Sequence, residues 1–136
     1  MDKRVAKIKG VIDGRTFSGR FTPEQLSFIT RAVVASARET LGDKLKEVIL
    51  FGSYARGDYT EWSDVDIMLL IDEDDQITVQ RLCEEVDDSP LLTELMIEMC
   101  APLSTIAVPY SRFERIKAEY PFYRNVDREG VRIYVG

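Results

Sequence analysis

Residues 48–72, VILFGSYARGDYTEWSDVDIMLLID, contain two hydrophobic segments joined by a polar loop. The first segment ends at Gly52 and Ser53, and a glycine lets the backbone turn sharply out of a strand. The second segment begins with Asp64 and Asp66 and is apolar on both faces beyond Asp66, which is typical of a central strand. The stretch therefore predicts two neighbouring strands with polar groups at the ends that meet the loop.

The rest of the chain alternates helix and strand signals. Thr22, Pro23 and Gln25 are typical of the capped start of a helix, and Gly42 would end it. Periodicity predicts the other elements, which in chain order are strands over 45–51 and 64–72, a helix over 77–100 with a restart at Ser89–Pro90, a strand over 103–108, a helix over 111–120 with a capping box from Ser111 to Glu114, a last turn or two of helix over 122–130, and a strand over 131–135. This order predicts an α/β (α+β) fold, a small mixed β-sheet flanked by helices.

The chain of 136 residues suits one compact domain, which we assign to residues 22–136. Residues 1–21 have a turn signal at Asp13–Gly14 between segments that alternate poorly. An N-terminal hairpin and a basic arm both remain open for this segment.

Several kinds of chemistry are excluded by composition. The chain has no histidine, which excludes Ser-His-Asp and Cys-His catalysis and the usual zinc sites. Cys83 and Cys100 fit no metal-binding spacing and lie in apolar periodic sequence, so we expect buried, reduced thiols. No apolar run is long enough to span a bilayer or to form a signal peptide, so we expect a cytoplasmic protein without a membrane segment.

The net charge of −6 is concentrated in the middle of the chain. Residues 58–98 contain fourteen acidic residues and a single basic residue, Arg81. Such a region repels a nucleic-acid backbone, so tight nucleic-acid binding is not expected. It suits divalent cations instead.

Asp64 and Asp66 are the first candidate ligands for such a cation. Two residues at i and i+2 of a strand point to the same face, about 6–7 Å apart. Their carboxylates would repel each other unless a cation lay between them. Oxygen ligands without histidine or cysteine favour Mg²⁺ or Mn²⁺. The alternative is a solvent-facing junction between a loop and a strand.

The turn between the two strands is suited to a phosphate group. Gly52 permits a close approach of the backbone, Ser53 adds a hydroxyl, and the amides that follow could cradle a phosphate. Arg56 is either a cation beside that phosphate or a solvated side chain. Because the two strands are consecutive, we expect the turn and the two aspartates to lie at the same edge of the sheet.

The segment GSYARGDYTEWSDVD resembles the G-S-x-x-x-G and S-D-x-D signature of the DNA polymerase β-like nucleotidyltransferases, above all their minimal single-domain (MNT) members, which are often paired with HEPN proteins. The resemblance implies a polymerase β-like core in which Gly52 and Ser53 hold the triphosphate of ATP or another NTP. It implies metal binding and catalysis by Asp64 and Asp66. We add Arg56 and Ser63 to the candidate nucleotide-binding residues.

By this resemblance the protein would be a Mg²⁺-dependent transferase that moves a nucleoside monophosphate, AMP from ATP, onto a hydroxyl. The acceptor would be a HEPN-type toxin, with this chain as its antitoxin. A small-molecule acceptor such as an aminoglycoside and the oligomeric state both stay open. The family usually has a third carboxylate on a later strand, but residues 103–108 contain no acid, and Glu94 and Glu98 are expected on the outer face of a helix. The alternative function is therefore a nucleotide-binding module that has lost its chemistry and neutralises a partner by binding it. An interface and the core both remain open for Phe122, Tyr123 and Tyr134, and we favour the core.

Overall fold

The computed structural model describes residues 21–99 and 103–136. Its four strands form one sheet in the order β3-β2-β1-β4. They are β1 (Leu45–Phe51), β2 (Val65–Ile71), β3 (Leu103–Pro109) and β4 (Val131–Val135). Strand β1 is antiparallel to both β2 and β4, whereas β2 and β3 are parallel. The predicted mixed sheet is confirmed; the predicted N-terminal hairpin or arm, apart from Phe21, and Cys100 lie outside the described residues.

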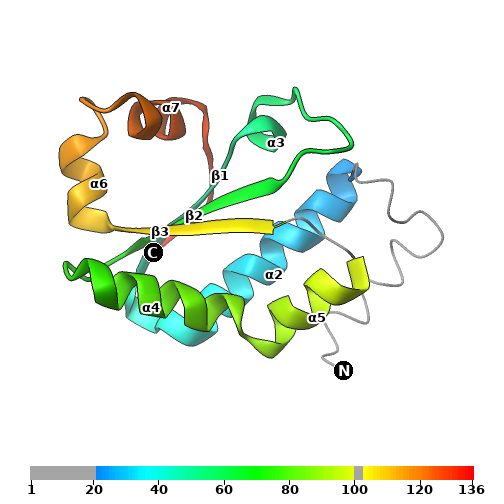
Figure 1. Cartoon of the computed structure of the whole chain (residues 1–136), viewed down its shortest axis with the longest axis horizontal. Helices are drawn as coiled ribbons and strands as arrows, with labels where there is room; N and C mark the ends of the chain where they lie inside the picture. The colour runs from blue at the N-terminus through cyan, green and yellow to red at the C-terminus, as the bar shows by residue number, and fades with distance from the viewer. Residues whose placement is uncertain (1–20, 100–102) are drawn as a thin grey trace.

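Helices cover both faces of this sheet (Figure 1). In chain order they are α2 (Pro23–Leu41), the short 3-10 helix η1 (Gly42–Lys44), α3 (Ser53–Arg56), α4 (Gln76–Asp87), α5 (Pro90–Met99), α6 (Tyr110–Ile116) and α7 (Pro121–Glu129). Helices α2, α4 and α5 lie on one face, and α6 and α7 lie on the other. No helix in the described ranges is long and apolar enough to cross a membrane.

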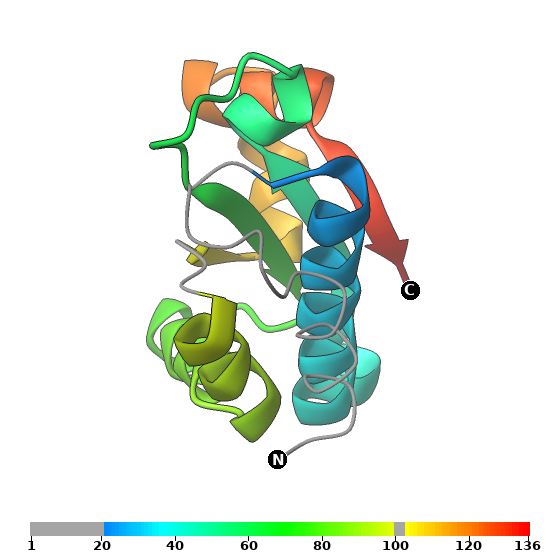
Figure 2. The ribbon, with the colours of Figure 1, turned by 90° about the vertical axis from the view of Figure 1, so that its right-hand side faces the viewer.

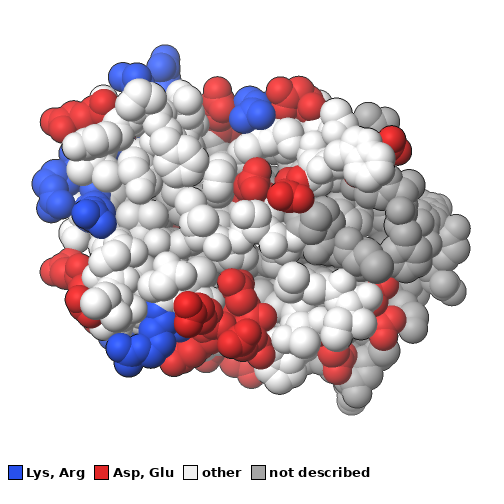
Figure 3. All heavy atoms as spheres, in the orientation of Figure 1, with Lys and Arg blue, Asp and Glu red and all other residues white. Residues whose placement is uncertain are grey.

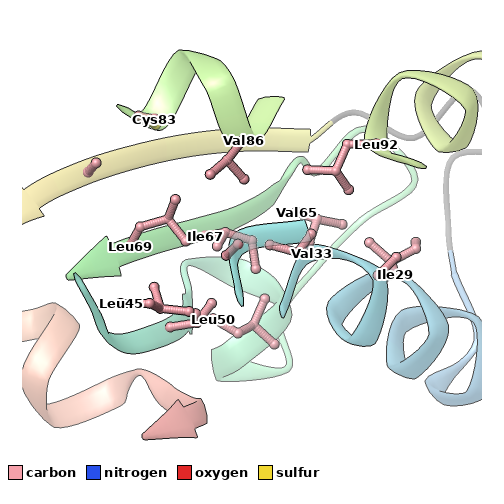
Figure 4. Close-up of a cluster of buried hydrophobic side chains, with 14 of the residues drawn as sticks. Ile29, Val33, Leu45, Leu50, Val65, Ile67, Leu69, Cys83, Val86 and Leu92 are labelled. Atoms are coloured by element: carbon pink, nitrogen blue, oxygen red, sulfur yellow. The ribbon is translucent and has the colours of Figure 1, made fainter. Parts of the chain in front are cut away.

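The side chains of β2 alternate between two hydrophobic clusters. Ile67 and Leu69 point into the larger cluster, against α2, α4 and α5 (Figure 4). Met68 and Leu70 belong to the smaller cluster, which includes side chains from α6 and α7. Because alternate residues of a strand share a face, Asp66 lies on the face of Met68 and Leu70, towards α6 and α7. The alternation thus decides which helices can reach the aspartate.

The N-terminus of α2 has the capping box that the sequence predicts. The hydroxyl of Thr22 accepts a hydrogen bond from the Gln25 amide at 3.1 Å, and Oε1 of Gln25 accepts one from the Thr22 amide at 2.8 Å. Two backbone donors that have no partner within the helix are satisfied in this way.

Two other helix boundaries were also predicted from the sequence. The helix expected over residues 77–100 is divided into α4 and α5, with Ser89 between them, as the Ser89–Pro90 signal indicates. The capping box expected from Ser111 to Glu114 is wrong. Helix α6 begins at Tyr110 without a side-chain cap, and the Ser111 hydroxyl donates to Oδ1 of Asp74 at 2.7 Å instead.

Acidic side chains gather over α4 in the space-filling view, which fits the concentration of charge seen in the sequence (Figure 3). On the inner side of the same helix, Cys83 is a buried free thiol whose pKa burial raises to about 12. The thiol therefore stays protonated at neutral pH. The expectation of a buried, reduced cysteine is confirmed for Cys83.

Candidate active site

The Gly-Ser turn occupies the end of β1. Gly52 has φ 75° and ψ −156°, a conformation that is essentially restricted to glycine. Its carbonyl accepts hydrogen bonds from the amides of Ala55 and Arg56, both at 3.1 Å, so a single helical turn, α3, follows at once. Gly57 ends that turn in the left-handed region. The chain therefore leaves the sheet sharply and presents the first amides of α3 beside the strand end.

Asp66 lies directly against this turn. It pairs with Phe51 across the β1–β2 ladder, and this pairing places it beside Gly52, the residue that follows Phe51. A Cβ added at Gly52 would overlap Oδ2 of Asp66 and lie 3.1 Å from its Cγ. The turn and the aspartate can approach this closely only because residue 52 has no side chain.

The carboxyl of Asp66 is electrostatically strained. Burial of this half-buried group raises its pKa above the ordinary range, and the nearby charge of Asp64 raises the pKa further, while Arg56 acts in the opposite sense. Asp64 is exposed and directly precedes β2. The two carboxylates thus repel each other, as expected of two aspartates at this spacing.

A pocket of about 360 Å³ opens beside Asp66, between the sheet edge and α7. Its lining comes from the end of β1, α3, β2 and α7, and consists of Phe51, Gly52, Ser53, Arg56, Asp66, Phe122, Asn125, Val126 and Glu129. Figures 1 and 2 both place α3 and α7 side by side at this end of the sheet. Four residues proposed from the sequence, Gly52, Ser53, Arg56 and Asp66, therefore lie around one pocket.

Arg56 links the two sides of the pocket. Its Nε lies 3.3 Å from Oδ2 of Asp58, and its Nη1 lies 3.6 Å from Oε2 of Glu129. Both ion pairs are exposed, so each contributes little to stability. Their effect is to hold a guanidinium group at the pocket, between α3 and α7.

Two of the predicted residues, Ser63 and Asp64, do not line the pocket. The Ser63 hydroxyl accepts a hydrogen bond from the Thr60 amide at 2.9 Å, within the loop that joins α3 to β2. The same loop is held at its base by Tyr59, whose ring stacks on Tyr54 at 4.4 Å between centroids, and it carries Trp62, which is 84% exposed.

Ser104 lies beside Asp66 on the neighbouring strand, β3. It is the parallel partner of Asp66, and it shares a face of β3 with Ile106 and Val108, which pack in the smaller cluster near α6 and α7. Across residues 21–99 and 103–136, no group of three or more acidic or cysteine side chains is arranged to hold a metal ion. The acid-free strand expected from the sequence is therefore the neighbour of Asp66.

Glu94 and Glu98 belong to α5, as expected, and not to a strand. Both are half-buried rather than fully exposed. Because α5 packs on the opposite face of the sheet from α7, these two residues do not line the pocket.

Sequence reasoning missed the contribution of α7. Phe122, Asn125 and Glu129 from this helix line the pocket, and the assignment of Phe122 to the core is wrong because 48% of the residue is exposed. The three positions follow an i, i+3, i+7 spacing, so they share one helical face. That spacing is visible in the sequence, but nothing local indicates which element the face meets.

Comparisons with known proteins identify the family of the chain. The nucleotidyltransferase domain family matches residues 34–128, which is most of the chain. A relative from Methanocaldococcus jannaschii, "Putative protein adenylyltransferase MJ0604", is 36% identical over 91 residues, which cover 67% of this chain and 80% of the relative. The chain belongs to the nucleotidyltransferase domain family. The predicted enzyme class is confirmed, and membership implies a nucleoside triphosphate substrate and a divalent metal ion.

Two solved structures resemble the chain at low sequence identity. A "putative nucleotidyltransferase from Sulfolobus solfataricus" is 17% identical, with a TM-score of 0.47 and coverage of 99% of this chain and 90% of the other. The toxin-antitoxin MntA-HpeT is 16% identical, with a TM-score of 0.46 and coverage of 76% and 71%. The family assignment itself rests on the sequence matches.

Proposed function

We propose that this protein transfers AMP from ATP onto a hydroxyl group of a protein partner, with Mg²⁺ or Mn²⁺ as the cofactor. The observation that carries the proposal is the contact between the Gly52 turn and Asp66, whose pKa is raised by burial and by Asp64. A half-buried carboxyl with a like-charged neighbour in a pocket is a feature of functional sites.

The residues present fit a magnesium ion. Mg²⁺ commonly binds one or two carboxylates together with phosphate oxygens of a substrate, which is the set that Asp64, Asp66 and a triphosphate would supply. When bound, the ion would offset negative charge on the phosphates. Two protein carboxylates suffice for this role, so the absence of a third acid beside Asp66 does not exclude it.

The turn residues would bind and orient the triphosphate. The Ser53 amide begins α3 directly after Gly52, which lies against Asp66. The Ser53 hydroxyl and the Arg56 guanidinium line the same pocket and add a donor and a positive charge. We assign Ser63 to fixing the loop before Asp64, because its hydroxyl is hydrogen-bonded to Thr60.

The reaction balances as a displacement at phosphorus. The acceptor oxygen forms a bond to the α-phosphorus, the bond from that phosphorus to the bridging oxygen of the β-phosphate breaks, and pyrophosphate leaves. The hydroxyl proton passes to solvent, because Ser104 stands where a third carboxylate would receive it. The chain's own contribution is the positioning of the reactants, which can supply about 7–11 kcal/mol of the barrier reduction.

A protein acceptor is supported by the name of the relative from M. jannaschii, a protein adenylyltransferase. We propose a HEPN-type toxin as that acceptor and this chain as its antitoxin, on the basis of the resemblance to MNT proteins. Trp62, exposed on the loop next to Asp64, provides a contact for a macromolecular partner near the reacting groups.

The experiment is transfer of label from α-labelled ATP to the protein encoded beside this chain, with Mg²⁺. Wild-type protein should label that neighbour, and Asp64→Asn should not, although it should keep the fold. Gln80→Glu, at an exposed position of α4, is the control for a surface substitution. Transfer by a variant that lacks both Asp64 and Asp66 would refute the assignment of the site.

A second function is favoured by one observation, the serine that stands opposite Asp66 on β3. A missing general base can cost about 10²–10⁴-fold in rate while nucleotide binding survives. The chain would then neutralise its partner by binding alone. In that case the double Asp64→Asn, Asp66→Asn variant would protect cells from the partner as well as the wild type does, whereas the transferase account predicts loss of protection.

A further inference from the structure

Helix α7 forms the side of the pocket that faces the Gly-Ser turn. Phe122, Asn125 and Glu129 line the pocket from this helix, while Gly52 and Ser53 line it from the end of the sheet. If the turn and Asp66 receive the phosphates and the metal ion, as the proposed function states, α7 is the side of the pocket that is left for the rest of the nucleotide. The volume of about 360 Å³ falls in the range of small-molecule sites.

Phe122 is an aromatic ring that is held in place yet remains accessible. It packs edge-on against Phe51 at 5.9 Å and against Tyr123 at 5.1 Å between ring centroids. Even so, 48% of Phe122 is exposed, and it lines the pocket. A fixed and accessible ring at a nucleotide site can stack on a base.

Asn125 lies one helical turn further along α7. It is exposed, and within the described part of the chain its side-chain amide makes no hydrogen bond. An asparagine amide both donates and accepts, so it can pair with two adjacent groups on an adenine edge. Guanine presents a different pattern, because its N1–H and its exocyclic amine both donate.

Helix α7 is anchored well enough to hold these groups in position. Arg132 on β4 donates to the backbone carbonyl of Asp127 at 2.8 Å and also bonds the Asp127 carboxylate and Oε1 of Glu47. Glu129 pairs with Arg56 across the pocket. Recognition groups on an anchored helix are placed more reproducibly than groups on a loop.

We propose that α7 is the base-recognition wall of this enzyme, in which Phe122 stacks on adenine and the Asn125 amide reads its hydrogen-bonding edge. This inference rests on the proposed function and names the residues that select the nucleotide. Glu129 would not read the base, because it is paired with Arg56.

The test is the ratio of affinities for ATP and GTP, measured by calorimetry with Mg²⁺ and non-hydrolysable analogues of both nucleotides. Wild-type protein should prefer the ATP analogue. Asn125→Asp replaces the amide donor by an acceptor, which suits guanine, so the ratio should move towards GTP by at least about tenfold. Because the added charge weakens the binding of both nucleotides alike, the ratio of the two affinities reports base recognition alone.

Two further variants complete the design. Gln80→Glu makes the same amide-to-acid change on the exposed face of α4, away from the pocket, and should leave the ratio unchanged. Phe122→Ala should lower the affinity for both nucleotides by about tenfold, in line with the loss of a stacking contact. Asn125 is exposed, so its variant tests the proposal even if Phe122→Ala fails to fold.

The outcomes separate this inference from the proposed function. If wild-type protein binds neither analogue, both proposals are overturned. If it binds ATP but Asn125→Asp leaves the ratio unchanged, the base-recognition wall is overturned and the proposed function stands. If the α7 variants bind both nucleotides normally but fail to label the partner, α7 faces the acceptor and the inference is again wrong.

Discussion

Gly52 lies so close to Asp66 that a Cβ at position 52 would overlap the Oδ2 atom of the carboxylate. The two halves of the motif, the turn after β1 and the acid at the start of β2, therefore constrain each other directly. The glycine is required both by its positive φ angle and by the position of the acid. Within this site, a change in the backbone at Gly52 therefore moves the Asp66 carboxylate.

Gly52→Ala should destabilise the fold and abolish nucleotide binding. The strained conformation costs about 1–3 kcal/mol for a residue with a side chain, and the new methyl group must displace Asp66. Chemical denaturation and ATP binding measure the two effects. Gly42→Ala is the matched control, because Gly42 also has a positive φ of 55° but has no atom within 4 Å of an added Cβ. It should lose stability and keep nucleotide binding; equal loss of binding in both variants would contradict this account.

Without metal, Asp66→Asn should stabilise the protein relative to wild type, and the gain should be larger at neutral pH than in acid. Burial and Asp64 raise the pKa of Asp66 in the folded state, so the protonated form is the one that the fold favours. The contribution of Asp66 to the stability of the wild type is therefore fully present below the ordinary aspartate pKa, about 3.9, and is lost as the pH rises through the raised pKa.

Denaturation of both proteins in EDTA across this pH range measures the effect. The advantage of the variant should grow with pH and then level off. The exposed substitution Asp43→Asn, away from the pocket, is the comparison for removal of a charge alone. A difference between Asp66→Asn and wild type that does not change with pH would show that the carboxyl is not strained.

Consecutive strands made the core of the site predictable, because LKEVILF and DVDIMLLID had to pair and so bring Gly52 to Asp66. The part played by α7 was not predictable from local signals. Phe122 reaches the pocket because β4 pairs with β1, with Gly130 alone separating α7 from β4, and such a long-range pairing has no local signature. The Ser111 cap failed for a similar reason, since a distant acceptor, Asp74, took the hydroxyl.

Ser104→Asp should raise the rate of transfer. The new carboxylate would stand beside Asp66 on the neighbouring strand, where it could take the proton of the acceptor hydroxyl. General-base catalysis contributes about 10²–10⁴-fold in favourable cases, so a gain of at least about tenfold is expected. Single-turnover labelling at saturating ATP and Mg²⁺ measures it. Ser104→Asn has a similar size without the charge and should give no gain; equal rates for the two variants would count against the role assigned to this position.

Arg132→Ala should lower the free energy of unfolding by about 1.5–3 kcal/mol, because it removes the charged hydrogen bonds from Arg132 to Asp127 and Glu47. Asp127 and Glu47 would lose their shared cation, and α7 would lose its anchor to the sheet. Arg128→Ala, at an exposed position of the same helix, should change stability by less than about 0.5 kcal/mol. Urea denaturation compares the two, and similar losses would show that Arg132 does not anchor α7.

The central claim is that Asp64 and Asp66 hold a divalent metal ion together with a nucleotide. Uptake of Mn²⁺ in the presence of ATP, followed by electron paramagnetic resonance of the free ion, tests it most directly. The double Asp64→Asn, Asp66→Asn variant is compared with Asp72→Asn, Asp74→Asn, which removes the same charge with the same spacing from the turn before α4. We predict that wild type and the Asp72/Asp74 variant take up the ion, and that the Asp64/Asp66 variant does not. Equal uptake by both double variants would contradict the account.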